Sequence, residues 1–217
     1  MQNASRWRLS GLFAVLLLFP AARAEAHPHV FVTATEEVLF DPAGRVTGIR
    51  HSWKFDDMYS AFMVQGLGTE GAILTREQLA PLAKTNVESL NEFAYFTSVK
   101  AAGKVSLFAD PVDYWIEEGS DKLLTLHFTL PLKSPASAKT VLSLAIYDPT
   151  YFVAFSLSDK DPIKLDAAPS GCSASVSKPK PLDATDSQKL SESFFTNMSP
   201  GTDFGIKLAE RAIIACP

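Results

Sequence analysis

The sequence predicts an α+β fold: a mostly antiparallel β-sheet, a helix pair inserted after the first hairpin, and a helical C-terminal segment. Three observations lead to this class. Two alternating segments flank a turn at residues 41–44, helical periodicity follows, and short runs rich in β-branched and aromatic residues dominate most of the rest. Strands and helices that are segregated in this way along a chain are typical of α+β domains.

Residues 1–26 have the pattern of an export signal, and we expect them to be absent from the folded protein. Arg6 and Arg8 precede an apolar run at residues 12–19, and small residues follow at spacings suited to cleavage. Cleavage after Ala24 and after Ala26 both fit, and the second makes His27 the amino terminus. The apolar run is too short to cross a bilayer. We therefore expect residues 27–217 to form one soluble periplasmic domain.

The first predicted element is a β-hairpin, with strands at residues 30–40 and 45–55 joined by Asp41-Pro42-Ala43-Gly44. A register that pairs residue 40 with residue 45 places mainly apolar side chains on one face and polar ones on the other. In this register His29 lies opposite Asp56, and a bulge would shift the pairing. The core face then holds Val30, Val32, Val38, Phe40, Arg45, Ile49, His51, Trp53 and Phe55.

Two helices are expected next. Residues 56–67 read as a helix, and a second apolar stripe with helical spacing runs from Leu79 to Phe93. Thr75 and Gln78 form a capping box at the start of the second helix. Together these segments predict a helix pair.

Strands are predicted for most of the remaining chain, with short turns such as Gly103-Lys104 between several of them. An extended linker is expected at Pro179-Lys180-Pro181, and a helix at residues 184–197. Residues 206–215 fit the helical and the strand period equally well. The predicted strands span residues 95–101, 105–109, 113–117, 123–132, 141–147, 151–155 and 173–177.

The two cysteines, Cys172 and Cys216, both lie in the part expected to be exported, where a structural disulfide is the favoured interpretation and a metal or redox role the alternative. Such a bridge would stabilise the fold by about 4 kcal/mol in the chain-entropy model. The chain carries 24 acidic and 20 basic residues, which argues against nucleic acid as a partner.

Four histidines are the main candidates for chemistry. His27 and His29 are two residues apart and would point the same way on a strand, so both imidazoles would reach one ion. A free amino group on His27 would chelate with its ring, an arrangement suited to copper or nickel and tolerated by zinc. Asp56 and His127 are the candidates to complete the ligand set. The alternative is that His27 and His29 merely begin an exposed strand.

Two other features favour structural roles. His51 shares its face with Ile49 and Trp53, which indicates a buried histidine bonded to a backbone group. Residues 66–77 have the outline of a helix-loop-helix calcium loop, with Glu70, Gly71 and Glu77 at its fifth, sixth and twelfth places. Glycines 66 and 68 stand where such a loop needs carboxylates, which indicates a loop without useful calcium affinity.

Four motifs together resemble one bacterial family, the domain of unknown function numbered 1007. They are Ala26-His27-Pro28-His29-Val30-Phe31, Trp53-Lys54-Phe55-Asp56-Asp57 with Tyr59-Ser60, residues 126–132 (LHFTLPL) and residues 147–152 (YDPTYF). The resemblance covers most of residues 26–172. It implies a periplasmic component of an ABC-type transport system, often beside nickel/cobalt-type permeases, and hence metal handling. The family's His-Pro-His start falls on His27, Pro28 and His29, and its calcium-like loop on residues 66–77.

The function that we expect is a periplasmic accessory protein. It would bind a divalent transition metal (nickel, cobalt, copper or zinc) and serve a membrane permease or an ABC-type transporter subunit. The alternative is a metal-independent interaction module that docks on a permease or envelope partner through its sheet edge and aromatic loops. Neither is an enzyme, because the sequence has no nucleophile elbow, phosphate loop or dinucleotide fingerprint. A copper oxidase-like enzyme that uses the terminal histidine is a third, weaker alternative.

Overall fold

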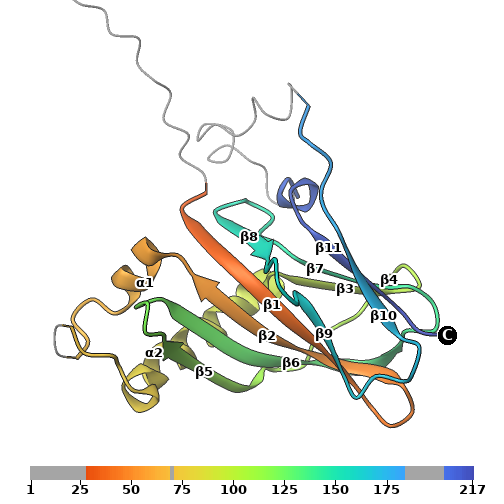
Figure 1. Cartoon of the computed structure of the whole chain (residues 1–217), viewed down its shortest axis with the longest axis horizontal. Helices are drawn as coiled ribbons and strands as arrows, with labels where there is room; N and C mark the ends of the chain where they lie inside the picture. The colour runs from red at the N-terminus through yellow and green to blue at the C-terminus, as the bar shows by residue number, and fades with distance from the viewer. Residues whose placement is uncertain (1–27, 69–70, 184–202) are drawn as a thin grey trace, which may run out of the picture.

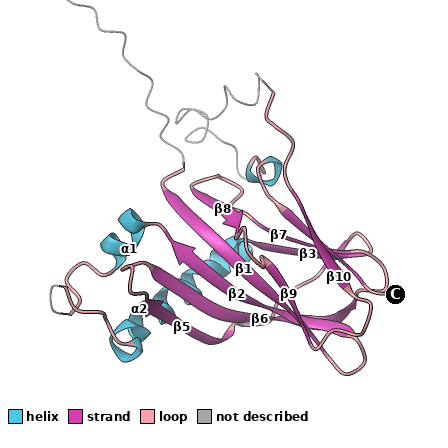
Figure 2. Cartoon of the chain, viewed as in Figure 1, coloured by secondary structure: helices cyan, strands magenta, loops and turns pink. Residues whose placement is uncertain are grey.

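Strands are the commonest regular structure in the described chain, and they form two sheets (Figures 1 and 2). The computed structural model describes residues 28–68, 71–183 and 203–217. Of these described residues, 44% are strand and 18% are helical. It is therefore a mainly β protein, and the predicted α+β class is wrong.

Sheet A, the larger sheet, contains the N-terminal hairpin. Its strand order is β5-β6-β2-β1-β8, and β9 pairs with the second half of β1. β1 pairs antiparallel with β2 and parallel with β8 and β9. The strands are β1 (Val30–Phe40), β2 (Arg45–Phe55), β5 (Val112–Glu118), β6 (Leu124–Ser137), β8 (Val153–Leu157) and β9 (Ile163–Asp166).

Sheet B, the smaller sheet, is antiparallel in the order β10-β11-β7-β3-β4. A disulfide joins Cys172 to Cys216 directly beside the first β10–β11 residue pair, Ser173 and Ala215, which confirms the predicted bridge. The strands are β3 (Thr97–Ala101), β4 (Lys104–Val105), β7 (Leu142–Ile146), β10 (Ser173–Ser177) and β11 (Arg211–Ala215).

The predicted helix pair is wrong. The one long helix, α2 (Arg76–Leu90), begins at the expected capping box of Thr75 and Gln78 and packs against β5. It continues into the 3-10 turn η1 (Asn91–Phe96). The other segment forms only two turns, α1 (Asp57–Met63), because glycines 66 and 68 follow with positive φ angles of 81° and 69°. Both helices lie at the end of sheet A away from β10 (Figure 1).

The predicted helical C-terminal segment is also wrong in the described residues. There the chain forms the short 3-10 turn η2 (Gly205–Lys207) and then β11, which lies between β10 and β7. Pairing on both edges decides between the two periods that residues 206–215 fit equally well. The helix expected at residues 184–197 falls outside the described residues.

The hairpin is confirmed, but its register is shifted by a bulge at Leu39 and Phe40. Beyond the bulge Val38 pairs with Ile49, and Val32 with Phe55. Val46 is therefore buried, and Arg45, which the unshifted register placed on the core face, is exposed.

The core lies between the sheets and under α2, and it includes a buried charged residue that the sequence interpretation omitted. Glu36 lies on the core face of β1, and its side chain is fully buried with that of His51. The largest fully buried side chains are Trp53, Phe128, Ile49, Leu79, Ile116, Leu124, Leu126, Leu130, Leu142, Leu144, Ile214 and His51.

No helix in the described ranges is both long and apolar enough to span a bilayer.

Candidate functional site

His29 lies on the surface at the start of β1. Its backbone N–H donates to the carbonyl of Phe152 at 2.9 Å, and its ring lies 4.6 Å from the Phe152 ring. These contacts fix the histidine beside the loop that precedes β8. His27, the other half of the expected chelate, lies outside the described residues.

Asp56 caps the N-terminus of α1 and ties it to β1. One carboxylate oxygen accepts from the Tyr59 N–H at 2.8 Å and the other from the Phe31 N–H at 2.7 Å. The shifted register places Asp56 beside Phe31, two residues from the expected partner His29. Each oxygen thus accepts a backbone N–H, so the carboxylate caps α1 and joins it to β1.

His127 lies on the outer face of sheet A, far from His29. His127 pairs with Ser52 and Ser52 pairs with Thr35, so six residues of β1 and two strand spacings separate the two histidines. The separation is about 20 Å along the strand and about 10 Å across it. One ion does not reach both.

Both ring nitrogens of His127 have partners. Nδ1 lies 2.9 Å from the Ser52 hydroxyl and Nε2 lies 3.2 Å from a Glu117 oxygen. Trp115 stacks on the ring at 4.6 Å, and the Arg76 guanidinium lies over Trp115 at 4.6 Å. Burial lowers the pKa of His127, although Glu117 opposes this shift through its hydrogen bond and charge.

Ser52, His127 and Glu117 have the residue types of a nucleophilic triad. Such a triad also needs N–H donors aimed at the developing oxyanion. Ser52 lies on the central strand β2, whose backbone pairs with β1 on one side and with β6 on the other. We therefore interpret this array as a device that holds His127 in place.

The structure therefore does not bring the four expected metal ligands together. Within residues 28–68, 71–183 and 203–217 no group of three or more histidine, cysteine, aspartate or glutamate side chains is arranged to hold a metal ion.

A lysine holds the calcium-like loop. The Lys122 ammonium donates to the carbonyls of Gly71 and Ala72 at 3.0 and 2.9 Å. It also pairs with Glu118, whose other oxygen accepts from the Leu74 N–H. Ala72 is the seventh place of the loop, where a calcium site uses the backbone carbonyl. The Lys122 ammonium thus contacts a carbonyl that a calcium ion would contact in such a loop. Because the lysine supplies the positive charge, the loop does not need the carboxylates that positions 66 and 68 lack.

The polar network that the sequence interpretation missed is in the core. One Glu36 oxygen lies 2.5 Å from Nδ1 of His51, and the other accepts from Trp53 Nε1 at 3.0 Å. The first contact meets the distance but not the angles of a hydrogen bond, and His51 Nε2 has no partner in the described residues. His51 also stacks on Phe128 at 4.4 Å. Its burial is confirmed, but its partner is a carboxylate and not a backbone group.

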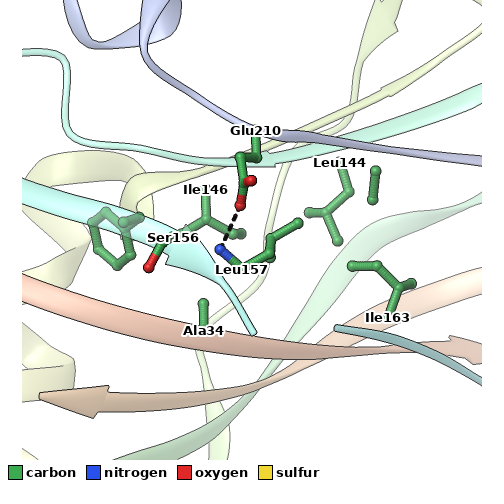
Figure 3. Close-up of a pocket in the computed structure, with 9 residues that line it drawn as sticks. Ala34, Leu144, Ile146, Ser156, Leu157, Ile163 and Glu210 are labelled. Atoms are coloured by element: carbon green, nitrogen blue, oxygen red, sulfur yellow. Dashed lines mark hydrogen bonds between the residues drawn. The ribbon is translucent and has the colours of Figure 1, made fainter. Parts of the chain in front are cut away.

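The sheet edge at β8 is blocked by carboxylates. Asp148 accepts from the Val153 N–H at 3.0 Å, and Glu210 accepts from the Leu157 N–H at 2.6 Å. Figure 3 shows Glu210 reaching across from the segment that leads into β11, beside a cavity of about 10 Å³. That volume is at the lower limit for one water molecule. Blocked N–H groups disfavour the addition of a further strand.

Comparisons with known proteins place the chain in a family and give no activity. A curated protein of Haemophilus influenzae, described as uncharacterized, is 24% identical over 206 residues, which are 94% of this chain and 98% of that protein. The acetylcholine-binding protein type 1 of Biomphalaria glabrata matches over 92% of both chains, with a TM-score of 0.38 and 11% identity. A likeness this low carries no argument about fold or ligand.

The family match covers nearly the whole chain. The model of the family described as protein of unknown function (DUF1007) matches residues 12–216, which include both sheets, the disulfide and the His-Pro-His segment. The chain belongs to the DUF1007 family of proteins of unknown function.

Proposed function

We propose that the protein is an exported accessory protein that binds one divalent transition metal at the start of its chain. The ligands are His29, the His27 ring and the α-amino group of His27. The observation that carries the proposal is the position of His29, which is fixed on the surface by the bond of its N–H to Phe152. His27 is two residues away in sequence, so the two imidazoles share one chelating segment.

The contacts of the other two candidates narrow the ligand set. The oxygens of Asp56 accept from two backbone N–H groups, and His127 lies about 20 Å along the strand from His29. Pro28 has no amide proton, so the backbone nitrogen between the two histidines is not a ligand. Imidazole and amine donors suit copper, nickel and zinc.

The proposal is tested by calorimetric titration of the exported chain, whose first residue is fixed by mass spectrometry. Nickel, cobalt, copper and zinc are titrated separately into the protein after chelator treatment. We expect one saturable site for at least one metal, lost in His29→Ala and retained in the control His127→Ala. Absence of saturable binding to all four metals contradicts the proposal, as does binding that His127→Ala removes and His29→Ala leaves intact.

Service to a membrane transporter is the second half of the proposal and rests on the ABC-type and nickel/cobalt context implied by the family resemblance. The test is transfer of the bound metal to a nickel/cobalt-type permease reconstituted in vesicles. We expect faster loading by the metal-bound protein than by the same concentration of free metal. Equal rates contradict this role and leave metal binding itself unaffected.

A second candidate function, a metal-independent interaction module, is favoured by exposed apolar side chains near the start of β1. Met58 and Phe62, one turn apart on α1, are 77% and 70% exposed, and Phe31 is 55% exposed. Apolar side chains grouped on a surface mark interaction sites. The blocked β8 edge argues for docking through side chains. Binding to a nickel/cobalt-type permease that survives chelator but is lost in Met58→Ser/Phe62→Ser supports this candidate, and the reverse result removes it.

A further inference from the structure

An apolar cavity lies between the core face of sheet A, α1, α2 and η1. Its volume is about 100 Å³, and twelve residues line it. β1, β2, β6 and β8 supply most of its wall, α2 closes it with Leu90, and Phe152 lies in the wall next to β8. The described metal-ligand candidate His29 is not among the residues that line this cavity.

The chemistry of the wall selects an uncharged occupant. No lining residue carries a formal charge at neutral pH, and the polar ones are Asn86, Tyr59 and the indole of Trp53. Trp53 directs its N–H away to Glu36. Burial raises the pKa of Tyr59, and the nearby charge of Asp56 adds to this rise, so its hydroxyl stays neutral. An ion that entered would lose its hydration without a counter-charge.

The aromatic part of the wall is rigidly arranged. Phe155 contacts Trp53 edge-on, with ring centroids 4.9 Å apart, and contacts Phe96 at 5.5 Å. Phe55 packs against Tyr59 at 5.1 Å. Rings held by one another in this way keep their positions, so the cavity does not depend on a ligand to shape it.

Strained backbone adjoins two aromatic rings of the cavity wall, those of Phe96 and Phe152. Ala94, Tyr95 and Phe96 have positive φ angles of 49°, 55° and 47°, and Tyr151, next to Phe152, has 57°. The left-handed region is unfavourable for residues other than glycine, because the side chain crowds the backbone. The three consecutive left-handed residues end at Phe96, and left-handed Tyr151 directly precedes Phe152. Phe96 and Phe152 both line the cavity, so strained backbone adjoins its wall at two places. Strain of this kind gathers at ligand clamps.

We propose that this cavity binds a small uncharged apolar molecule, either a single aromatic ring or a branched hydrocarbon of similar size. An engineered apolar cavity of about 150 Å³ binds benzene. The cavity here is somewhat smaller, at about 100 Å³. Filling an empty apolar cavity restores packing contacts that its wall lacks.

The test uses benzene, p-cresol and benzoate as probes, followed by ¹⁵N NMR of the full exported chain in the presence of EDTA. We expect saturable shifts with benzene and p-cresol at residues of β1, β2 and α2, and none with benzoate. Because chelator is present, this result stands or falls independently of the metal site. Absence of saturable shifts with both neutral probes overturns the proposal.

A matched pair of variants localises the binding. Val153→Phe fills the cavity and is expected to weaken benzene binding roughly tenfold or more. Val105→Phe, on the exposed strand β4, adds the same volume elsewhere and should leave binding unchanged. If Val153→Phe does not fold, Leu90→Phe fills the cavity from α2. Equal affinity of the filled and control variants contradicts the proposal. Binding of N-acetyl-phenylalanine amide without binding of benzene does so too, because it identifies the occupant as a partner's side chain.

Discussion

Glu36→Leu is expected to be among the most destabilising single substitutions in this chain. It leaves the buried Trp53 Nε1 donor facing an apolar side chain and removes the carboxylate that contacts His51 Nδ1. Loss of the partner of a buried polar group costs about 1–3 kcal/mol. We therefore expect the free energy of unfolding to fall by about 3 kcal/mol.

His51→Phe in the same background separates the network from a simple packing effect. Phenylalanine keeps a ring stacked on Phe128, and with Glu36→Leu it removes the stranded imidazole. The double variant should therefore be roughly 1–3 kcal/mol more stable than the sum of the two single losses. Glu37→Leu, which removes the part-exposed partner of Arg50, is the matched control and should cost at most about 1 kcal/mol.

The assay is guanidinium unfolding at pH 7 with the disulfide intact, followed by circular dichroism. The free energies of unfolding are compared among variants whose m-values are equal. Additivity of the two substitutions within about 0.5 kcal/mol refutes the reasoning, because residues of one network must couple. A loss for Glu36→Leu no larger than that for Glu37→Leu refutes it as well.

Three further predictions concern the outer contacts. Asp56→Ala removes the cap of α1 and its link to Phe31, so thermal unfolding should show a loss of about 1–2 kcal/mol, whereas Asp57→Ala, the adjacent control, should lose less. Lys122→Met removes the ammonium that donates to the carbonyls of Gly71 and Ala72. Amide hydrogen exchange near residue 72 should therefore become faster, without a comparable change in β6. Unchanged exchange near residue 72 contradicts the view that Lys122 stabilises this loop. Because burial lowers the pKa of His127, its unfolded state takes up a proton first, and stability should fall as the pH drops below about 6.5. His127→Gln should flatten that part of the unfolding profile, and an unchanged profile contradicts the assignment.

Local patterns predicted much of the sheet framework. Alternation in residues 30–40 and 45–55 located β1 and β2, and an isolated cysteine pair predicted the disulfide. The capping box located the start of α2 at Thr75. The strands and the helix start follow from neighbouring residues, and the disulfide follows from the presence of two cysteines. No knowledge of tertiary contacts was needed to predict them. The four-residue strand β9 was missed, because so short a run carries little periodicity.

Tertiary contacts decided what local patterns left open. The bulge at Leu39 and Phe40 moved every later pair of the hairpin, and with it the expected approach of Asp56 to His29. Residues 211–215 became a strand because β7 and β10 offer pairing on both sides. The burial of Glu36 follows from the alternation of β1, because Glu36 lies on the same face as Ala34 and Val38. Its partner His51 lies on the neighbouring strand and could not be assigned without the strand pairing.

The candidate site shows the same limit. His27 and His29 are neighbours in sequence, so their proximity is a local property. Asp56 and His127 needed a fold to be tested as partners, and the fold places one at a helix cap and the other two strands away. Sequence reasoning therefore named a candidate chelating segment, which stays a prediction, and it did not anticipate the positions of Asp56 and His127.

Copper(II) titration of the chain prepared to begin at His27, followed by electron paramagnetic resonance, tests the proposed metal site most directly. The protein is compared with its free and its acetylated amino terminus, since acetylation removes the amine donor and leaves both imidazoles. We predict one copper per chain with nitrogen ligands, and an affinity that falls roughly tenfold or more on acetylation and again in His29→Ala. A spectrum and affinity unchanged by both modifications, or no saturable copper signal, would contradict a metal site at the start of this chain.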